Sequence, residues 1–125
     1  MLYRSKAVDS LLGRYRVTMN NSDMNDWRVE FPWRGTNCGY LGYYEGSRAV
    51  SFGWELGGND VVLIFYVGTQ SDWSKQYPWA ADRQQEIVER VGQEVIRQSA
   101  PNCKADIDVR DDGYTYLLIR KKPAA

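Results

Sequence analysis

The chain has 125 residues, with 16 Lys and Arg against 16 Asp and Glu, and it contains no histidine. This length corresponds to one domain, and the balanced charge argues against a dedicated DNA-binding domain, which usually carries a clear basic excess. The absence of histidine excludes Ser-His-Asp and Cys-His nucleophilic pairs and every metal site that needs an imidazole. We therefore expect a single globular domain over residues 1–125.

The N-terminal quarter is expected to hold a short helix and a strand. Four apolar residues share one helical face within Tyr3–Leu12, and Gly13 follows as a C-terminal cap. Apolar and polar residues then alternate over Tyr15–Met19, which is typical of a strand.

The middle of the chain is dominated by strand patterns. Apolar and polar residues alternate over Trp27–Arg34 and Ala49–Leu56, which predicts strands with one face toward solvent. Pro32 has no N–H to donate, so the first of these strands is expected at a sheet edge or a bulge. A shorter strand is expected at Tyr40–Glu45. The continuous apolar run Val61–Val67 predicts a central strand that is covered on both faces.

A long helix and a hairpin complete the pattern. The helix is expected from about Asp82 to Ser99, with one apolar face and a capping box of Asp82 and Gln85. Gly92 inside it is expected where the helix packs closely against the sheet. Strands at residues 105–110 and 114–120 flank a turn at residues 111–113.

Short turns between successive strands favour antiparallel pairing. The sequence thus predicts an α+β fold with an antiparallel twisted sheet of about six to seven strands. One long helix from the C-terminal half packs on one face of this sheet, and a short helix precedes the strands. The order of the strands does not follow from the sequence.

Aromatic residues reach 14% of the chain, with five Trp and nine Tyr, and they are the first candidates for binding. Trp27, Phe31, Phe52 and Trp54 lie at apolar positions of their strands and are expected in the core. Tyr43 and Tyr44 are adjacent, so only one of them can point inward. The candidate binding residues are Trp33, Tyr40, Tyr43, Tyr44, Glu45, Arg48, Glu55, Trp73, Tyr77 and Trp79.

Charged residues offer two further hypotheses. Glu45 and Arg48 flank the Gly46-Ser47 turn, where they could clasp a ligand, although an ordinary turn is the favoured interpretation. Glu30 and Glu55 could act as an acid and base pair if they faced each other, but surface ion pairs with arginine are favoured.

Several site classes have no support in the sequence. There is no glycine-rich nucleotide motif, and we expect no cofactor and no metal. Cys38 and Cys103 are expected to be free thiols. The start of the chain has no apolar leader and no window is long enough to cross a membrane, so a cytoplasmic location is expected.

The favoured hypothesis is a non-catalytic protein-binding module, of the inhibitor, immunity-type or accessory kind, that uses exposed aromatic residues. Its partner would be another protein, or a second copy of the chain in a homodimer formed through exposed aromatics or the Trp27–Arg34 edge. The alternative is a binder of a small apolar or aromatic ligand, in an aromatic-lined pocket between sheet and helix. A histidine-free enzyme that uses a carboxylate with Arg and Tyr is a third hypothesis and is less favoured. Nucleic acid is disfavoured by the zero net charge.

Overall fold

The computed structural model describes residues 26–123, so the expected helix at Tyr3–Leu12 and strand at Tyr15–Met19 lie outside the described residues. The described strands are β1 (Trp27–Glu30), β2 (Cys38–Glu45), β3 (Arg48–Leu56), β4 (Val61–Gly68), β5 (Cys103–Val109) and β6 (Thr115–Lys121). The described helices are α2 (Gln70–Gln76), the 3-10 helix η1 (Pro78–Ala80) and α3 (Gln84–Ser99). The α+β class predicted from the sequence is confirmed.

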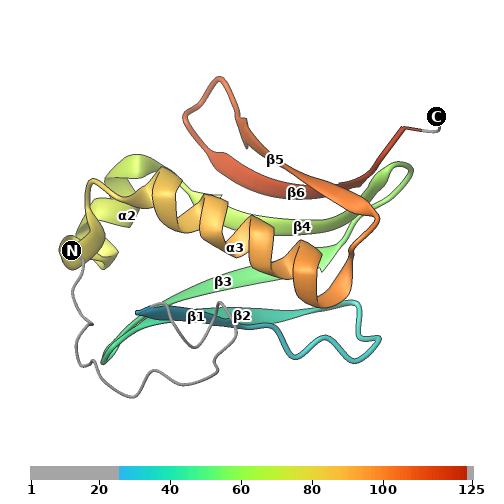
Figure 1. The fold of residues 1–125 in the computed structure, drawn as a ribbon. Helices are drawn as coiled ribbons and strands as arrows, with labels where there is room; N and C mark the ends of the chain where they lie inside the picture. Colours follow the sequence, from blue (N-terminus) through green and yellow to red (C-terminus); the bar gives the residue numbers. More distant parts are fainter. Residues whose placement is uncertain (1–25, 124–125) are drawn as a thin grey trace, which may run out of the picture.

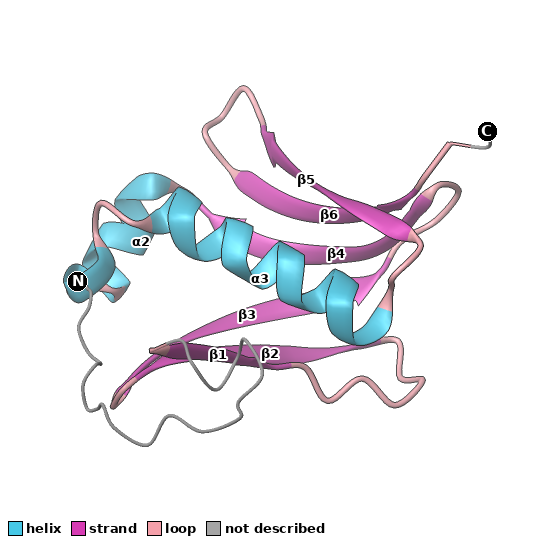
Figure 2. Cartoon of the chain, in the orientation of Figure 1, coloured by secondary structure: helices cyan, strands magenta, loops and turns pink. Residues whose placement is uncertain are grey.

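The strands form one antiparallel sheet in the order β1-β2-β3-β4-β6-β5. Figure 1 shows that the sheet curls around α3, which lies along its hollow side, while α2 stands near one end. Figure 2 shows β1, β2 and β3 below the long helix and β5 and β6 above it, with β4 passing behind. Because β1 and β5 are the outermost strands, the predicted edge position of the strand that contains Trp27 is confirmed.

Alternation along the strands separates an inner face, which contacts α3, from an outer face. Val50, Phe52 and Trp54 on β3 are buried, whereas Ser51 and Glu55 between and beyond them are exposed. Tyr43 points inward and is fully buried, and its neighbour Tyr44 is half-buried on the outer face. The apolar stripe of α3 closes the inner face with Ile87, Val88, Val91 and Val95, all at most 1% exposed.

Gly92 lies where α3 packs closely against β5 and β6. A Cβ atom added at Gly92 would lie 3.0 Å from the Cβ of Ala105 and 3.3 Å from Cδ1 of Leu117. The expectation that this glycine permits close packing is therefore confirmed. The expected capping box is wrong, because α3 begins at Gln84 and its N-cap residue, Arg83, makes no side-chain cap hydrogen bond.

The segment that carries Trp73 and Trp79 forms two short helices that the sequence did not predict. The Thr69 hydroxyl accepts a hydrogen bond from the backbone N–H of Asp72 at 3.1 Å and caps α2. Trp73 is 2% exposed, packs beside Phe52, and donates its indole N–H to the Ala80 carbonyl at 2.7 Å. This segment therefore closes one end of the core.

β3 and β4 pair only at one end. Their register covers Gly53–Leu56 of β3, so the first half of β3 has no strand partner on that side. The Tyr77 hydroxyl lies against this free stretch, 3.3 Å from the backbone nitrogen of Ser51 and 3.4 Å from its carbonyl oxygen. β4 is central as predicted, but no described helix covers its outer face, where Ile64 and Tyr66 are half-buried.

Candidate functional site

A row of tyrosines crosses the outer face of the sheet, on the side opposite α3. The strand registers align Tyr40 with Gly53, Gly53 with Tyr66, and Tyr66 with Tyr116. The Tyr66 and Tyr116 rings meet edge to face at 5.6 Å, and the Tyr114 ring lies 4.9 Å from that of Tyr116. We call Tyr40, Tyr66, Tyr114 and Tyr116 the tyrosine row.

Tyr40 is the most exposed member of this row. Its side chain is 74% exposed, although large aromatic residues are usually well buried on average. The ring lies over Gly53, where an added Cβ would be 3.8 Å from Cε1 of Tyr40. A rigid and solvent-exposed ring of this kind offers contact area to a partner at a low cost in conformational entropy.

A shallow hollow of about 330 Å³ lies beside Tyr40 on the outer face. Its floor includes Gly42, over which the Tyr44 ring folds, so that a Cβ at residue 42 would meet the Tyr44 hydroxyl oxygen at 2.6 Å. The hollow opens to solvent and lies on the outer face. Its lining residues are Glu30, Pro32, Tyr40, Leu41, Gly42, Tyr44, Ala49, Val50, Ser51 and Tyr77.

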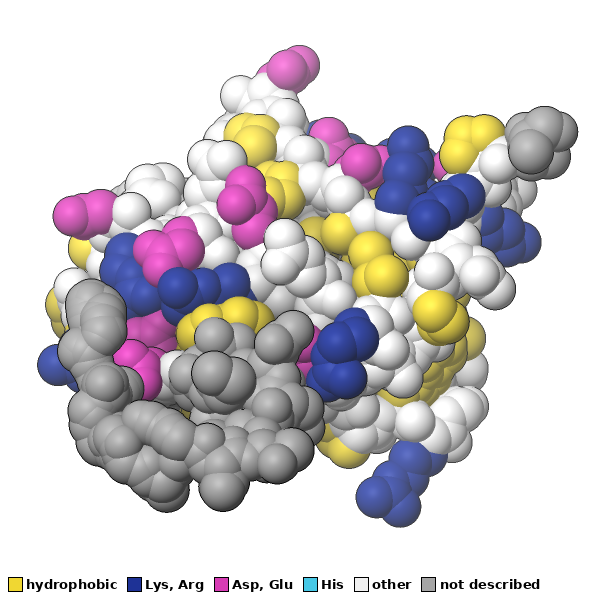
Figure 3. Space-filling view, in the orientation of Figure 1, with side chains coloured by type: hydrophobic (Ala, Val, Ile, Leu, Met, Phe, Trp, Pro, Cys, Tyr) yellow, Lys and Arg dark blue, Asp and Glu magenta, His cyan; other side chains and the backbone are white. Residues whose placement is uncertain are grey.

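Charges on the outer face neutralise one another. Ion pairs join Arg28 to Glu30 at 3.2 Å, Arg120 to Asp106 at 3.1 Å, and Arg110 to Asp108 at 2.7 Å. Figure 3 views the molecule from the side of α3 and shows that acidic and basic side chains are intermixed on that opposite side as well. Over the described part of the chain, the outer face therefore offers no continuous basic stripe for a phosphate backbone.

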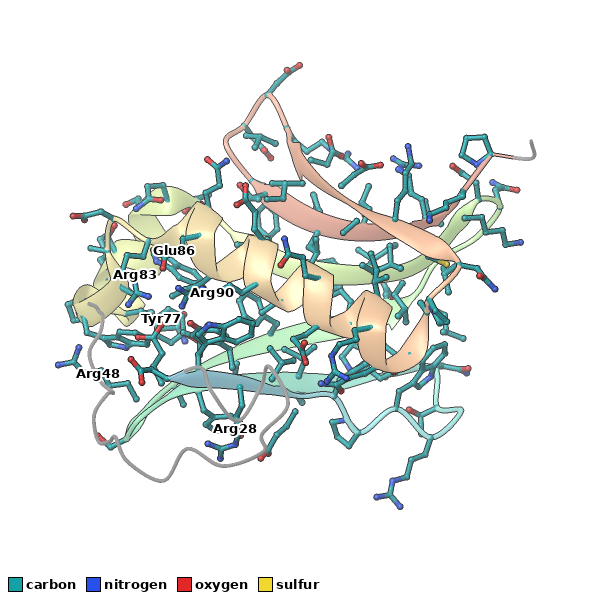
Figure 4. The ribbon with its side chains drawn as sticks, in the orientation of Figure 1. Arg28, Arg48, Tyr77, Arg83, Glu86 and Arg90 are labelled. Atoms are coloured by element: carbon teal, nitrogen blue, oxygen red, sulfur yellow. The ribbon has the colours of Figure 1, made fainter. Side chains whose placement is uncertain are left out.

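A second cluster lies on the inner face, where the end of β2 meets the start of α3. The Glu45 carboxylate accepts hydrogen bonds from both terminal nitrogens of Arg83, at 3.0 and 2.6 Å, and from Arg90 at 3.1 Å. The buried Tyr43 hydroxyl also donates to Glu45. Glu86 binds Arg83 at 3.1 Å and Arg90 at 2.8 Å, which places all these groups at one end of α3 (Figure 4).

The electrostatics of this Glu45 cluster are those of a saturated ion pair. Burial alone would raise the pKa of Glu45, but the hydrogen bonds from Arg83 and Tyr43 outweigh it and lower that pKa. Burial, together with the hydrogen bond to Glu45, raises the pKa of Tyr43 well above its ordinary value. Neither group is ready to exchange a proton near neutral pH. Because the ion pairs of Glu45 join β2 to Arg83 and Arg90, the cluster acts as a clamp between sheet and helix.

The structure separates the sequence-predicted site residues into three groups. Tyr40 and Tyr44 lie on the outer face, and Tyr77 lines the same hollow. Trp33, Tyr43 and Trp73 lie in or against the core, where Trp33 stacks on Phe31 at 5.8 Å. Glu45 lies in the inner cluster, and the Trp79 ring nearby is covered by the guanidinium groups of Arg48 and Arg83 at 5.5 and 5.9 Å.

The proposed acid and base pair is not assembled. Glu30 on β1 aligns with Gly42 of β2, whereas Glu55 on β3 aligns with Cys38, so the strand β2 and four residues along it separate the two carboxylates. Within residues 26–123, Glu55 forms no ion pair, which differs from the surface pair with arginine that the sequence suggested.

The two cysteines are free thiols, on β2 and β5 with three strands between them. Among the described residues, no group of three or more Cys, Asp or Glu side chains is arranged to hold a metal ion. The helices described between residues 26 and 123 include none long and apolar enough to cross a membrane.

Sequence reasoning missed Tyr114 and Tyr116 of the tyrosine row and the partners of Glu45. The available signal was the alternation of Tyr114, Tyr116 and Leu118, which places both tyrosines on one side of a strand. Arg83 was inside the expected helix, but only the packing of α3 against the sheet brings it beside Glu45. No protein-family model, curated protein or solved structure matches this chain.

Proposed function

We propose that this protein is a non-catalytic binding module that holds a partner protein on the outer face of its sheet. The observation that carries the proposal is the tyrosine row with Tyr40 exposed at 74% beside an open hollow. Tyrosine is enriched at the energetic centres of protein interfaces because it combines a large apolar ring with a hydrogen-bonding tip.

The surrounding charges favour a protein over other kinds of partner. Because Arg28, Arg110 and Arg120 of the outer face are paired with acidic neighbours, the part of this face formed by residues 26–123 carries no excess of positive charge for nucleic acid. A rim of paired charges around a more apolar centre resembles the general anatomy of protein interfaces. An enzymatic role receives no support from Glu45, whose carboxylate is fully occupied by Arg83, Arg90 and Tyr43.

The test places a photo-crosslinking amino acid at Tyr40 in the protein's own cells, with the same group at the exposed Lys75 of α2 as the matched control. We expect one discrete crosslinked protein from position 40 and none from position 75. With that partner purified, Tyr40→Ala and Tyr116→Ala should each weaken binding by about tenfold or more, whereas Lys75→Ala should not. Equal crosslinking at both positions, or none at position 40, would contradict the proposal.

A small ligand in the hollow is the second candidate function, and the hollow itself is what favours it. Its volume of about 330 Å³ lies at the lower end of the range of ligand sites, and Tyr40, Tyr44 and Tyr77 supply aromatic contacts. A screen of aromatic fragments by amide chemical-shift changes tests it. Shifts confined to Gly42, Tyr44 and Ser51, and abolished by Tyr44→Ala, would support the ligand hypothesis over a protein partner.

A further inference from the structure

The two edges of the sheet differ in how their backbone groups are covered. At the β1 edge the strand has four residues, and the side-chain amide of Gln98 on α3 donates to the Val29 carbonyl at 3.1 Å. The Arg90 guanidinium lies 5.1 Å from the centre of the Trp27 ring at the same edge. A short strand that is capped in this way is poorly suited to pairing with another strand.

The β5 edge is longer, and no strand within residues 26–123 pairs with its outer side. β5 has seven residues in continuous register with β6 from Cys103 to Val109, without a bulge or a proline. The backbone N–H of Arg110 bonds to the Tyr114 carbonyl, so every second residue before it, Asp108, Asp106 and Lys104, directs its N–H and C=O groups toward β6. Ala105 and Ile107 must therefore direct their N–H and C=O groups away from β6, toward the free edge. No side chain of residues 26–123 bonds to these groups.

The inner surface beside this edge is incompletely covered. Two hollows, of about 340 and 300 Å³, follow the groove between α3 and β5, and Ile107 lines both of them. Val109 at the end of β5 is 64% exposed, although it belongs to the inner-facing set of its strand. The core therefore extends to an edge at which the apolar side chains are only partly buried and the outward-directed backbone groups have no hydrogen-bond partner among residues 26–123.

We propose that β5 pairs with β5 of a second copy of this chain, antiparallel and centred on Ala105, so that two sheets join into one. Cross-strand partners in this register are Lys104 and Asp106 of the other copy, and the pair occurs twice by symmetry. The inner side places Ile107 opposite Cys103 of the second copy. Opposite charges directly across a strand pair are stabilising, and like charges are destabilising.

The charge pattern of β5 selects this register among the alternatives. Backbone hydrogen bonds can form only where the outward-directed residues, at odd-numbered positions, lie opposite one another. Three antiparallel registers of this kind pair five or more residues of the strand with itself, centred on Ala105, on Asp106 or on Ile107. The second places Asp106 opposite Asp106, and the third places Asp106 opposite Asp108 twice. Only the register centred on Ala105 places no like charges opposite each other, because Lys104 faces Asp106 twice and Asp108 faces Asn102. This self-complementarity is what identifies a second copy as the occupant.

Sedimentation equilibrium of the full chain tests the proposal. We expect a reversible dimer of twice the 14.4 kDa chain mass, which should be populated well below about 1 mM. Lys104→Glu should raise the dimer dissociation constant about 30-fold, because two attractive pairs become repulsive. The matched control Lys122→Glu makes the same charge change beyond the end of β6 and should leave the constant within about twofold.

Two further variants separate strand pairing from a general effect of charge. Asp106→Lys alone should also raise the dimer dissociation constant about 30-fold, but an equimolar mixture with Lys104→Glu should restore a heterodimer, because both kinds of cross-strand pair are again of opposite charge. Ala105→Pro removes an N–H at the free edge and no bond to β6, so it should abolish the dimer and leave the far-UV circular dichroism unchanged.

A wild-type chain that stays monomeric up to about 1 mM would overturn the proposal. Equal effects of Lys104→Glu and Lys122→Glu, or a mixture that stays monomeric, would overturn the register. The dimer leaves the tyrosine row free, so its failure would not bear on partner binding by the outer face.

Discussion

Replacing Glu45 with Gln is expected to destabilise the fold by about 2 kcal/mol. The carboxylate accepts three arginine hydrogen bonds and one from Tyr43, and its side chain is 19% exposed. Removing one partner of a fully buried ion pair costs about 3–5 kcal/mol. The side chains of Arg83 and Arg90 are 31% and 29% exposed, so water can solvate part of the uncompensated charge, and we lower the expected loss accordingly.

Equilibrium unfolding in urea, followed by tryptophan fluorescence, measures this change as a lower midpoint with an unchanged m-value. The matched control is Glu30→Gln, which breaks the ion pair of two side chains that are more than half exposed, and should cost less than about 0.5 kcal/mol. Combining Glu45→Gln with Arg83→Gln should show a coupling energy of about 1 kcal/mol or more. If Glu45→Gln and Glu30→Gln had the same small effect, the Glu45 cluster would not be a clamp.

Acid should destabilise the protein, because arginine hydrogen bonds lower the pKa values of Glu45, Glu86 and Glu94 in the folded state. This stability is fully present above the ordinary carboxyl pKa of 4.5, and urea midpoints should fall progressively as the pH drops below it; a flat profile down to pH of about 3 would contradict this. Gly39→Ala should cost about 1–3 kcal/mol, because its Cβ would lie 3.2 Å from the buried Trp54 ring; thermal unfolding that matches wild type would disprove the contact. Tyr77→Phe should cost about 1 kcal/mol in the same assay, because the Ser51 backbone loses its hydroxyl partner, and a neutral result would mean that water replaces it.

Strand patterns could be predicted well because one face of the sheet is buried and the other is not. The alternation of Val50, Phe52 and Trp54 with exposed residues identified both the strand and its inner face. The adjacency of Tyr43 and Tyr44 correctly required one to be buried and the other to face outward. Gly92 was informative because a glycine inside a helix is unfavourable unless space demands it.

Two kinds of feature could not be predicted from the sequence. The first is the α2 helix, which has no apolar periodicity because only Trp73 of its seven residues is buried. The second is every feature that depends on strand order. The tyrosine row joins residues from β2, β4 and β6, and the Glu45 cluster joins β2 to α3. Local sequence shows which side a residue faces on its own strand, but the register between distant strands decides which residues meet.

β6 lies between β4 and β5, and this arrangement limits the order in which the domain can fold. The hairpins β1–β2, β2–β3 and β3–β4 need only neighbouring residues, whereas β4 gains its second neighbour only when β6 returns past both helices. The apolar residues of β4, including Leu63 and Phe65, therefore lack a strand neighbour on one side until the last described strand is in place. Closing such a long loop is the slow kind of step in folding. During synthesis the open side of β4 is the surface that a chaperone, or a neighbouring nascent chain, would meet first.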